Sequence, residues 1–308
     1  MAVWNLGSIN IDRFYRLPHL PAAGETLAAS GFDEGLGGKG ANMSVAIARA
    51  AARVCHIGAV GPDGRWARDR LLEYGVDTRH IAQVDGASGH ANINVDASGE
   101  NQIVLYQGAN HQISSDQIAL ALAEADTNDT FLTQNETNGQ RAGAEVAKQM
   151  GLRVVYAAAP FQADAVADVL DLTDLLVLNE IEAQQLEAAT QLAVDKLPVE
   201  NVVVTLGGKG ARWYDQRNAQ MTDVAAYPVT PVDTTGAGDT FTGFLVAGLD
   251  RGLPMLQALD LASRAAAIMV TREGTADVIP DLKDIEDCLL YTSPSPRDQR
   301  GSRMPSSA

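Results

Sequence analysis

A short run of small residues carries the strongest chemical signal in this sequence. Residues 233–239 read Asp-Thr-Thr-Gly-Ala-Gly-Asp, and apolar residues follow them at helical spacing. The first N–H groups of a helix have no partner inside the helix, and the helix dipole is positive at that end. Because small residues let a ligand approach these N–H groups closely, the segment predicts a binding site for phosphate, or for charge that develops on a phosphoryl group.

Asp239 lies in the first turn of the expected helix. A carboxylate beside an anion site is poorly placed to bind phosphate, but it is well placed to take the proton from a hydroxyl group that attacks phosphorus. The alternative is that Asp239 only interacts with the helix dipole while Thr240 supports the turn. For this string alone, the alternative is the more common case.

A second glycine-rich segment changes this balance. Residues 37–42 read Gly-Gly-Lys-Gly-Ala-Asn and open another alanine-rich helix. The overlapping string at 35–40 also satisfies the G-x-G-x-x-G pattern of dinucleotide-binding folds. That pattern needs a buried strand just before its first glycine, and residues 29–34, Ala-Ser-Gly-Phe-Asp-Glu, do not form one. No G-x-x-x-x-G-K-[ST] string occurs, which argues against a P-loop kinase.

The elements that must position these segments alternate along the chain. Buried strands are expected at 3–6, 54–60, 131–133, 154–157, 175–178 and 202–206, and helices at 41–53, 64–74, 114–125 and 139–150. This alternation predicts a largely parallel sheet covered on both faces. Residues 90–106 alternate like a hairpin and, with 13–35, are interpreted as a small β-sheet lid. Residues 288–308 lack periodicity and are interpreted as a disordered or non-native tail.

The two glycine segments, in this order, resemble the two sequence motifs of the ribokinase-like (PfkB) family of carbohydrate kinases. Further similarities occur in family order at 7–12, 179–182, 205–210 and 271–274, so the resemblance covers about residues 3–285. It implies one kinase domain over 1–287, built as a three-layer α/β/α sandwich with about eight or nine strands in a mostly parallel central sheet. The segment 186–201 is shorter than is usual in the family, which predicts a reduced helix there.

The resemblance also implies the site residues. The expected catalytic groups are Asp239 as the base and the N–H groups of Gly236, Ala237 and Gly238. The residues expected to contact the sugar are Asn10, Asp12, Gly38, Lys39, Gly40, Asn42, Glu136 and Asp239. The residues expected to contact the nucleotide are Asn179, Thr205, Leu206, Gly207, Gly208, Lys209, Gly210, Gly238 and Ser263. Glu182 is expected to bind Mg²⁺ through water, and the expected K⁺ ligands are Asp233, Thr235, Met269, Arg272, Gly274 and Val278. Asn179 also fits a helix N-cap, and the two roles are compatible.

The activity that the resemblance implies is ATP-dependent phosphorylation of a sugar hydroxymethyl group, with D-ribose as the first choice. Mg²⁺ is expected with ATP and K⁺ as an activator, and a homodimer is expected through the lid. One alternative is a family member that acts on a different sugar or on a nucleoside. Another is a non-catalytic sugar-sensing protein on the same fold, which the intact residues Gly236, Gly238 and Asp239 argue against.

The composition limits the binding partners and the cellular compartment that we expect for this protein. The formal net charge of −16 argues against nucleic acid or an anionic membrane as the main partner, because both require basic surfaces. Two cysteines and five scattered histidines offer neither a disulfide framework nor metal-ligand spacing. The sequence shows no apolar run of transmembrane length and no signal-peptide pattern. We therefore expect a cytoplasmic protein.

Overall fold

A nine-stranded sheet forms the centre of the fold in this computed structural model, which describes residues 1–292, with backbone only for 288–292. Its order is β13-β12-β11-β10-β9-β8-β1-β4-β5. The strands are β1 Ala2–Leu6, β4 Arg53–Val60, β5 Ile81–Gln83, β8 Thr130–Gln134, β9 Arg153–Ala157, β10 Leu175–Asn179, β11 Asn201–Thr205, β12 Ala211–Asp215 and β13 Gln220–Val224. From β5 to β11 every pairing is parallel, which confirms the predicted sheet.

The antiparallel edge formed by β12 and β13 was not predicted. These two strands pair with β11 and with each other after the turn at 206–210. They extend the sheet beyond the helix–strand alternation, and their side chains are mostly half-buried or exposed. An edge hairpin of this kind lacks the continuous apolar runs that marked the inner strands.

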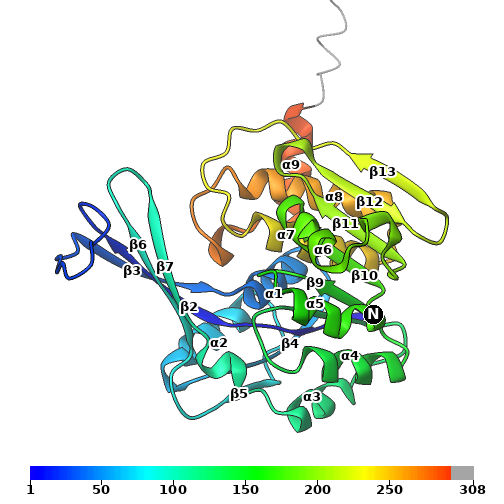
Figure 1. The fold of residues 1–308 in the computed structure, drawn as a ribbon, viewed down its shortest axis with the longest axis horizontal. Helices are drawn as coiled ribbons and strands as arrows, with labels where there is room; N and C mark the ends of the chain where they lie inside the picture. Colours follow the sequence, from blue (N-terminus) through cyan, green and yellow to red (C-terminus); the bar gives the residue numbers. More distant parts are fainter. Residues whose placement is uncertain (293–308) are drawn as a thin grey trace, which may run out of the picture.

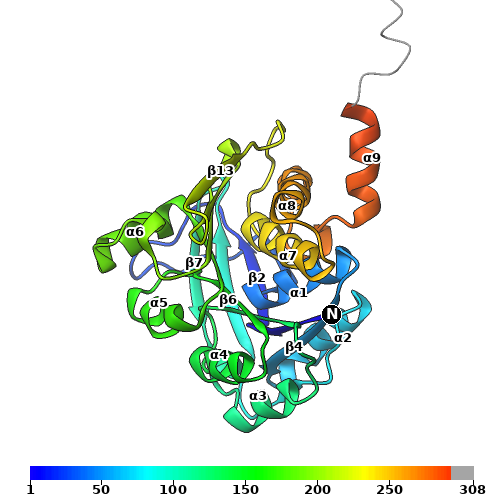
Figure 2. The same ribbon diagram turned by 90° about the vertical axis from the view of Figure 1, so that its right-hand side faces the viewer.

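Helices cover both faces of the sheet (Figures 1 and 2). They are α1 Lys39–Arg49, α2 Arg65–Glu73, α3 Ser115–Leu122, α4 Gln140–Gln149, α5 Ala163–Val169, α6 Glu180–Thr190, α7 Ala237–Asp250, α8 Met255–Met269 and α9 Leu282–Thr292. Val3 of β1 joins the apolar core under α1, α7 and α8, whereas its neighbour Trp4 joins the core under α3 and α4. This alternation gives the three-layer α/β/α sandwich.

A second sheet of four strands projects from one side of the sandwich (Figure 1). Its order is β3-β2-β6-β7, with β2 Asn10–Arg16, β3 Gly31–Gly37, β6 Gly89–Val95 and β7 Asn101–Tyr106. The predicted lid is therefore present, and the expected hairpin at 90–106 is β6 and β7. Only three residues separate the end of β1 from the start of β2, so one short segment links the central sheet to the lid.

Several predicted boundaries shift. Helix α3 is capped by the Ser114 hydroxyl, which accepts from the Gln117 N–H, and it ends at Leu122 rather than near 125. The reduced helix before β11 is a single 3-10 turn, η4 Val194–Lys196. Helix α9 continues through Thr292, into the segment predicted as a tail, and 293–308 lie outside the described residues. Among the helices described here, none has the length and apolar character needed to cross a membrane.

Helices α1 and α7 cross at very short range. A Cβ atom placed on Gly243 of α7 would lie 2.4 Å from Cβ of Ala46 and 2.9 Å from the carbonyl oxygen of Met43, both in α1. Only glycine leaves room for this approach. The crossing fixes the two helices that begin at the two glycine-rich segments.

Candidate active site

The start of α7 forms one wall of the candidate site. Gly236 has a φ of 72°, in the left-handed region that favours glycine, and helix α7 begins directly after it. Asp239 lies in the first turn and is only 7% exposed. Its Oδ2 accepts a hydrogen bond of 2.9 Å from Nδ2 of Asn42, in the first turns of α1. The two glycine segments therefore meet through these side chains.

The start of α1 forms the opposite wall. Gly38 has a φ of 92°, and a Cβ atom there would lie 2.9 Å from the backbone nitrogen of Asn10. Gly40 packs directly on Gly7: a Cβ atom on Gly40 would lie 2.4 Å from Cα of Gly7. The glycines of this segment thus serve close packing of α1 against the end of β1, in addition to any role in admitting a ligand.

Polar side chains line the junction between β1 and the lid. Oε2 of Glu136 accepts hydrogen bonds from the Ser8 hydroxyl, at 2.5 Å, and from the backbone N–H of Lys39, at 3.0 Å. Asn10 accepts a 2.8 Å hydrogen bond from the side-chain amide of Asn110, which fixes its orientation. Ser8 and Asn110 were not predicted as site residues.

Asp12 approaches this junction from β2. Its carboxylate lies so close to Gly37 that a Cβ atom there would be 1.9 Å from Oδ2. Gly37 therefore makes the space into which the Asp12 side chain fits.

The charges of four carboxyl groups, those of Asp12, Glu136, Glu182 and Asp239, act on Lys39. Burial raises the pKa of Asp12 to about 7, and the charges of Glu136 and Asp239 add to this rise. Burial also raises the pKa of Asp239, against the opposing effects of the Lys39 charge and the Asn42 hydrogen bond. The negative charge of Asp239 raises the pKa of Lys39, so the lysine stays protonated. This cluster can donate and accept hydrogen bonds to several hydroxyl groups at once.

A cavity of about 240 Å³ extends from Lys39 and Asp239 to the ends of the central strands. The other predicted sugar-binding residues do not line it, namely Asn10, Asp12, Gly38, Gly40, Asn42 and Glu136. Seven predicted site residues line it: Lys39, Asn179, Glu182, Thr205, Gly236, Gly238 and Asp239. Thr234 and Thr242 line it as well and were not predicted. Thr242 lies three residues after Asp239, one helical turn further along α7, and that spacing was a usable signal.

The strand ends on the far side of the cavity carry the predicted nucleotide residues. Asn179 and Glu182 form a reciprocal capping box at the start of α6, with both hydrogen bonds at 2.8 Å. Burial raises the pKa of Glu182. Residues 206–210 form a tight turn between β11 and β12, in which Gly207 and Gly210 have positive φ.

Ser263 and the turn at 206–210 do not line the cavity itself. Ser263 lies on α8 and is 6% exposed, and its hydroxyl has no hydrogen-bond partner among the residues that the structure describes.

The predicted cation loop packs behind the start of α7. The two carboxylate oxygens of Asp233 accept N–H groups of Thr235, at 2.9 Å, and of Gly274, at 3.3 Å. Asp233 therefore connects two loops that are distant in sequence. The carbonyl oxygen of Val278, an expected cation ligand, accepts a 3.0 Å hydrogen bond from the Arg272 guanidinium, which uses one of its two lone pairs.

Met269, another member of the predicted cation set, is fully buried. Its side chain packs against Gly236, where a Cβ atom would lie 3.3 Å from its Cε.

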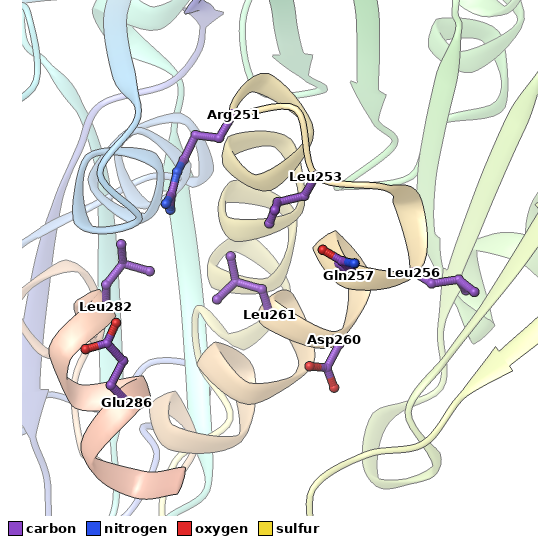
Figure 3. Close-up of a pocket in the computed structure, with 8 residues that line it drawn as sticks. All are labelled: Arg251, Leu253, Leu256, Gln257, Asp260, Leu261, Leu282 and Glu286. Carbon is purple, nitrogen blue, oxygen red and sulfur yellow. The ribbon is translucent and has the colours of Figure 1, made fainter.

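A second pocket, of about 490 Å³, lies between the α7–α8 turn, α8 and α9 (Figure 3). Leucine side chains and the long side chains of Arg251, Gln257 and Glu286 line it. The Arg251 guanidinium donates to the carbonyl oxygen of Ala50. This pocket shares no lining residue with the cavity at Asp239, and it lacks a helix N-terminus with glycines. The smaller cavity is therefore the better candidate for phosphoryl chemistry.

Comparisons with known proteins agree on one family. The family described as pfkB family carbohydrate kinase matches residues 3–282. The ribokinase of Haemophilus influenzae is 36% identical over 301 residues, which cover 93% of this chain and 97% of the relative. The deoxyribokinase of Salmonella typhi is 31% identical, with coverage of 92% and 97%. The ribokinase of Arabidopsis thaliana complexed with ribose and ATP is similar with a TM-score of 0.82 at 28% identity, covering 95% and 98%.

Proposed function

This chain belongs to the pfkB family of carbohydrate kinases, and we propose that it transfers the terminal phosphoryl group of ATP to the hydroxymethyl group of D-ribose. The product is D-ribose 5-phosphate. The observation that carries the proposal is the buried Asp239 carboxylate, oriented by Asn42 at the N-terminus of α7 and facing a cavity that reaches the strand ends. The similarity to ribokinases selects ribose among the sugars.

The sugar occupies the junction between β1, the lid and α1. Its hydroxyl groups contact Asn10, Asp12, Gly38, Lys39, Gly40, Asn42, Glu136 and Asp239. The Oδ1 atom of Asn42 is buried and has no partner among the described residues, so it is available to accept a hydrogen bond from a sugar hydroxyl group. Carboxylates and amides can each hold two hydroxyl groups, which suits a polyol.

Asp239 acts as the general base. Its Oδ2 is held by Asn42, so the carboxylate has a fixed direction toward the cavity. Burial makes the carboxylate a stronger base, while the nearby Lys39 keeps it ionised. As the hydroxymethyl oxygen attacks phosphorus, Asp239 takes its proton. The N–H groups of Gly236, Ala237 and Gly238 stabilise the charge on the transferring phosphoryl group, and the Ala237 N–H exchanges its long 3.3 Å hydrogen bond to the Thr234 carbonyl for the phosphoryl oxygen.

ATP lies along the ends of β10 and β11. Asn179 and Thr205 line the cavity there, and the turn Leu206–Gly210 follows directly. The phosphates extend from this turn toward Gly238. The base end of the nucleotide reaches α8, where the buried Ser263 hydroxyl has an unused hydrogen-bonding capacity.

The residues at the cavity fit a Mg²⁺ ion held mainly by water and by the phosphates of ATP. The described residues contain no group of three or more His, Cys, Asp or Glu side chains placed to hold a metal. Glu182 lines the cavity, and a single carboxylate is sufficient for an ion that keeps most of its waters. When bound, the ion neutralises charge on the ATP phosphates.

K⁺ binding behind the anion-binding loop is also part of the proposal. Asp233 supplies the negative charge, and each of its oxygens keeps lone pairs beyond the one hydrogen bond that it accepts. The carbonyl groups of Thr235, Met269, Arg272, Gly274 and Val278 complete the set. A cation held there stabilises the orientation of the loop whose N–H groups face the phosphate.

A homodimer through the lid completes the proposal. Apolar residues of β7 and β3 are about half-exposed, namely Ile103 at 55%, Val104 at 59%, Leu105 at 47%, Tyr106 at 53% and Phe32 at 54%. Edge strands with exposed apolar side chains favour pairing with a second chain. Sedimentation of the chain and of an Ile103→Lys/Leu105→Lys variant tests this: the expected result is a dimer that the double substitution converts to a monomer.

Turnover of MgATP with D-ribose, 2-deoxy-D-ribose, other pentoses and nucleosides tests the function. We expect D-ribose to give the highest kcat/KM. A polar site that hydrogen-bonds a hydroxyl group discriminates against an analogue that lacks it. The similarity to deoxyribokinase makes 2-deoxy-D-ribose the main competing substrate. A preference for it would change the proposed substrate and leave the proposed phosphoryl transfer intact. Sugar binding without any turnover would favour the sugar-sensing alternative.

A further inference from the structure

Four polar side chains lie buried directly beneath the proposed sugar site. They are Asn5 of β1, Ser44 of α1, His56 of β4 and Gln134 of β8, and each is at most 1% exposed. None of them has a role in the proposed chemistry. Buried polar groups are costly unless they are hydrogen-bonded, so their partners define what they do.

Their hydrogen bonds form one chain with a fixed direction. The Gln134 amide donates to Oδ1 of Asn5 at 2.7 Å. The Asn5 amide donates to the Ser44 hydroxyl and to the carbonyl oxygen of Gly40, both at 2.8 Å. The Ser44 hydroxyl lies 2.8 Å from Nδ1 of His56.

His56 closes the chain at a backbone carbonyl. Its Nε2 lies 3.0 Å from the carbonyl oxygen of Gly7. A carbonyl can only accept, so Nε2 carries the proton, and Nδ1 of the neutral ring accepts from Ser44. Gly58 makes room for the ring, since a Cβ atom there would lie 2.7 Å from Nε2.

The network contacts one backbone carbonyl group in each of the two segments of the proposed sugar site: that of Gly7, through His56, and that of Gly40, through Asn5. Gly7 precedes Ser8 and Asn10, and Gly40 lies between Lys39 and Asn42. The segments also touch above the network: Gly40 N–H donates to the Ser8 hydroxyl at 3.2 Å, and Ala41 N–H donates to the Ser8 carbonyl at 2.8 Å. The network therefore fixes the distance between Gly7 and Gly40 from below.

We infer that Asn5, Ser44 and His56 are positioning residues, which hold the sugar site in register with Asp239 through the Gly7 and Gly40 carbonyl groups. The inference rests on the proposed sugar kinase function. An apolar core would fill the same space at similar stability, because a hydrogen bond contributes little net energy to folding. A directional chain differs from apolar packing in allowing only one arrangement of the two segments.

Ser44→Ala in the full chain is the main test, because it removes one hydroxyl and breaks the chain at its centre. We expect kcat/KM for the sugar to fall by about tenfold to a hundredfold, the range associated with small misplacement of reacting groups. The KM for MgATP stays unchanged, since the network does not reach the strand ends that carry the nucleotide. Amide hydrogen exchange in 38–42 increases.

Thr173→Val is the matched control. Thr173 is 6% exposed and its hydroxyl donates to the Val169 carbonyl, away from the site. We expect this variant to lose stability while its sugar kinetics and its exchange in 38–42 match the wild type. If Ser44→Ala behaves like this control, with only a lower melting temperature, the positioning role is wrong.

A second pair of variants covers the case in which Ser44→Ala does not fold. His56→Gln places an amide near the Nε2 position and keeps a donor for Gly7, whereas His56→Asn places its amide near Nδ1 and loses that donor. We expect kcat/KM for the sugar to be higher in His56→Gln than in His56→Asn. Equal kinetics and equal exchange in 38–42 for the two variants would overturn the inference. If the wild type turns over no sugar, the proposed function is wrong. The role of the network in holding residues 38–42 is then tested by amide hydrogen exchange alone.

Discussion

Asn42 and Asp239 are 197 positions apart in the sequence, and the side-chain amide of one donates to the carboxylate of the other at 2.9 Å. Each residue lies near the start of the helix that follows a glycine-rich segment. Their hydrogen bond therefore joins the proposed acceptor site to the proposed phosphoryl site. It leaves the Asp239 carboxylate with one oxygen oriented by the protein and the other available to a substrate.

Substitution of Asp239 by Asn is expected to keep the fold and ATP binding and to lower kcat by about 10²–10⁴-fold, the usual contribution of a general base. The substitution preserves shape and burial while removing proton acceptance. Initial rates with ribose and MgATP, together with nucleotide binding by calorimetry, measure the two effects. Turnover near that of the wild type would exclude Asp239 as the base.

Substitution of Asn42 by Leu is expected to lower kcat less than Asp239→Asn does, because the base remains but loses its orientation. A buried charge without its hydrogen bond also becomes easier to protonate. The pH at which kcat/KM reaches half of its maximum should therefore move upward relative to the wild type. A pH profile identical to that of the wild type would show that Asn42 does not orient the base.

Asp12 predicts a pH dependence of sugar use. Burial raises its pKa to about 7, so in the free enzyme it loses its proton near neutral pH. An ionised carboxylate can accept hydrogen bonds from two hydroxyl groups, whereas the protonated form also has to donate one, so the proposed sugar contacts of Asp12 depend on its protonation. We expect kcat/KM for ribose to rise as the pH increases through about 7. Asp12→Asn should lose this inflection, and an inflection that persists in that variant belongs to another group.

Activation by a monovalent cation is expected from the position of Asp233. Its carboxylate links the loop at 233–235 to Gly274, and this loop leads into the N–H groups of the proposed anion site at 236–238. We expect higher turnover in K⁺ than in tetramethylammonium at equal ionic strength, and a weaker response in Asp233→Ala. Ordering of the loop before the reaction lowers the later cost of organising the transition state. Equal rates in the two cations would exclude the cation site and would leave the proposed kinase activity in place.

The stability of the fold should depend on pH through His56. Burial lowers its pKa from 6.5 to about 4, so below pH 6.5 the unfolded chain binds a proton that the folded chain does not. The free energy of unfolding therefore falls as the pH decreases from about 6.5 to about 4. The loss from this group is about 3 kcal/mol, at about 1.4 kcal/mol per pKa unit. The difference between wild type and His56→Gln, measured by urea unfolding, isolates the effect; a constant difference across this range would contradict it.

The sheet and both glycine segments could be predicted from the sequence because their signals are local. Buried parallel strands are continuous apolar runs, and a helix that begins after glycine can be recognised within a few residues. The capping box at Asn179 and Glu182 was predictable for the same reason. The edge strands β12 and β13 lack such runs, and they were missed.

The contacts that build the site could not be predicted, because they join distant parts of the chain. Asn110 orients Asn10 across 100 positions, and Glu136 reaches Ser8 across 128. His56 had no metal-ligand spacing in the sequence, and its partners become apparent only when β1, β4 and α1 are packed together. A sequence pattern can identify a polar residue, but which other residue it contacts depends on how distant elements pack in the fold.

Gly243, where α7 crosses α1, has a consequence for how specificity can change. At this crossing the backbones of α1 and α7 are closely packed, so we expect the proposed sugar segment and the proposed anion-binding turn to move together. Motions that admit substrate or expel product are then expected in the four-stranded sheet, whose strand β2 follows the central strand β1 after a link of three residues. A change of sugar preference is consequently easier to reach by substitutions in that sheet than by any that disturb the crossing.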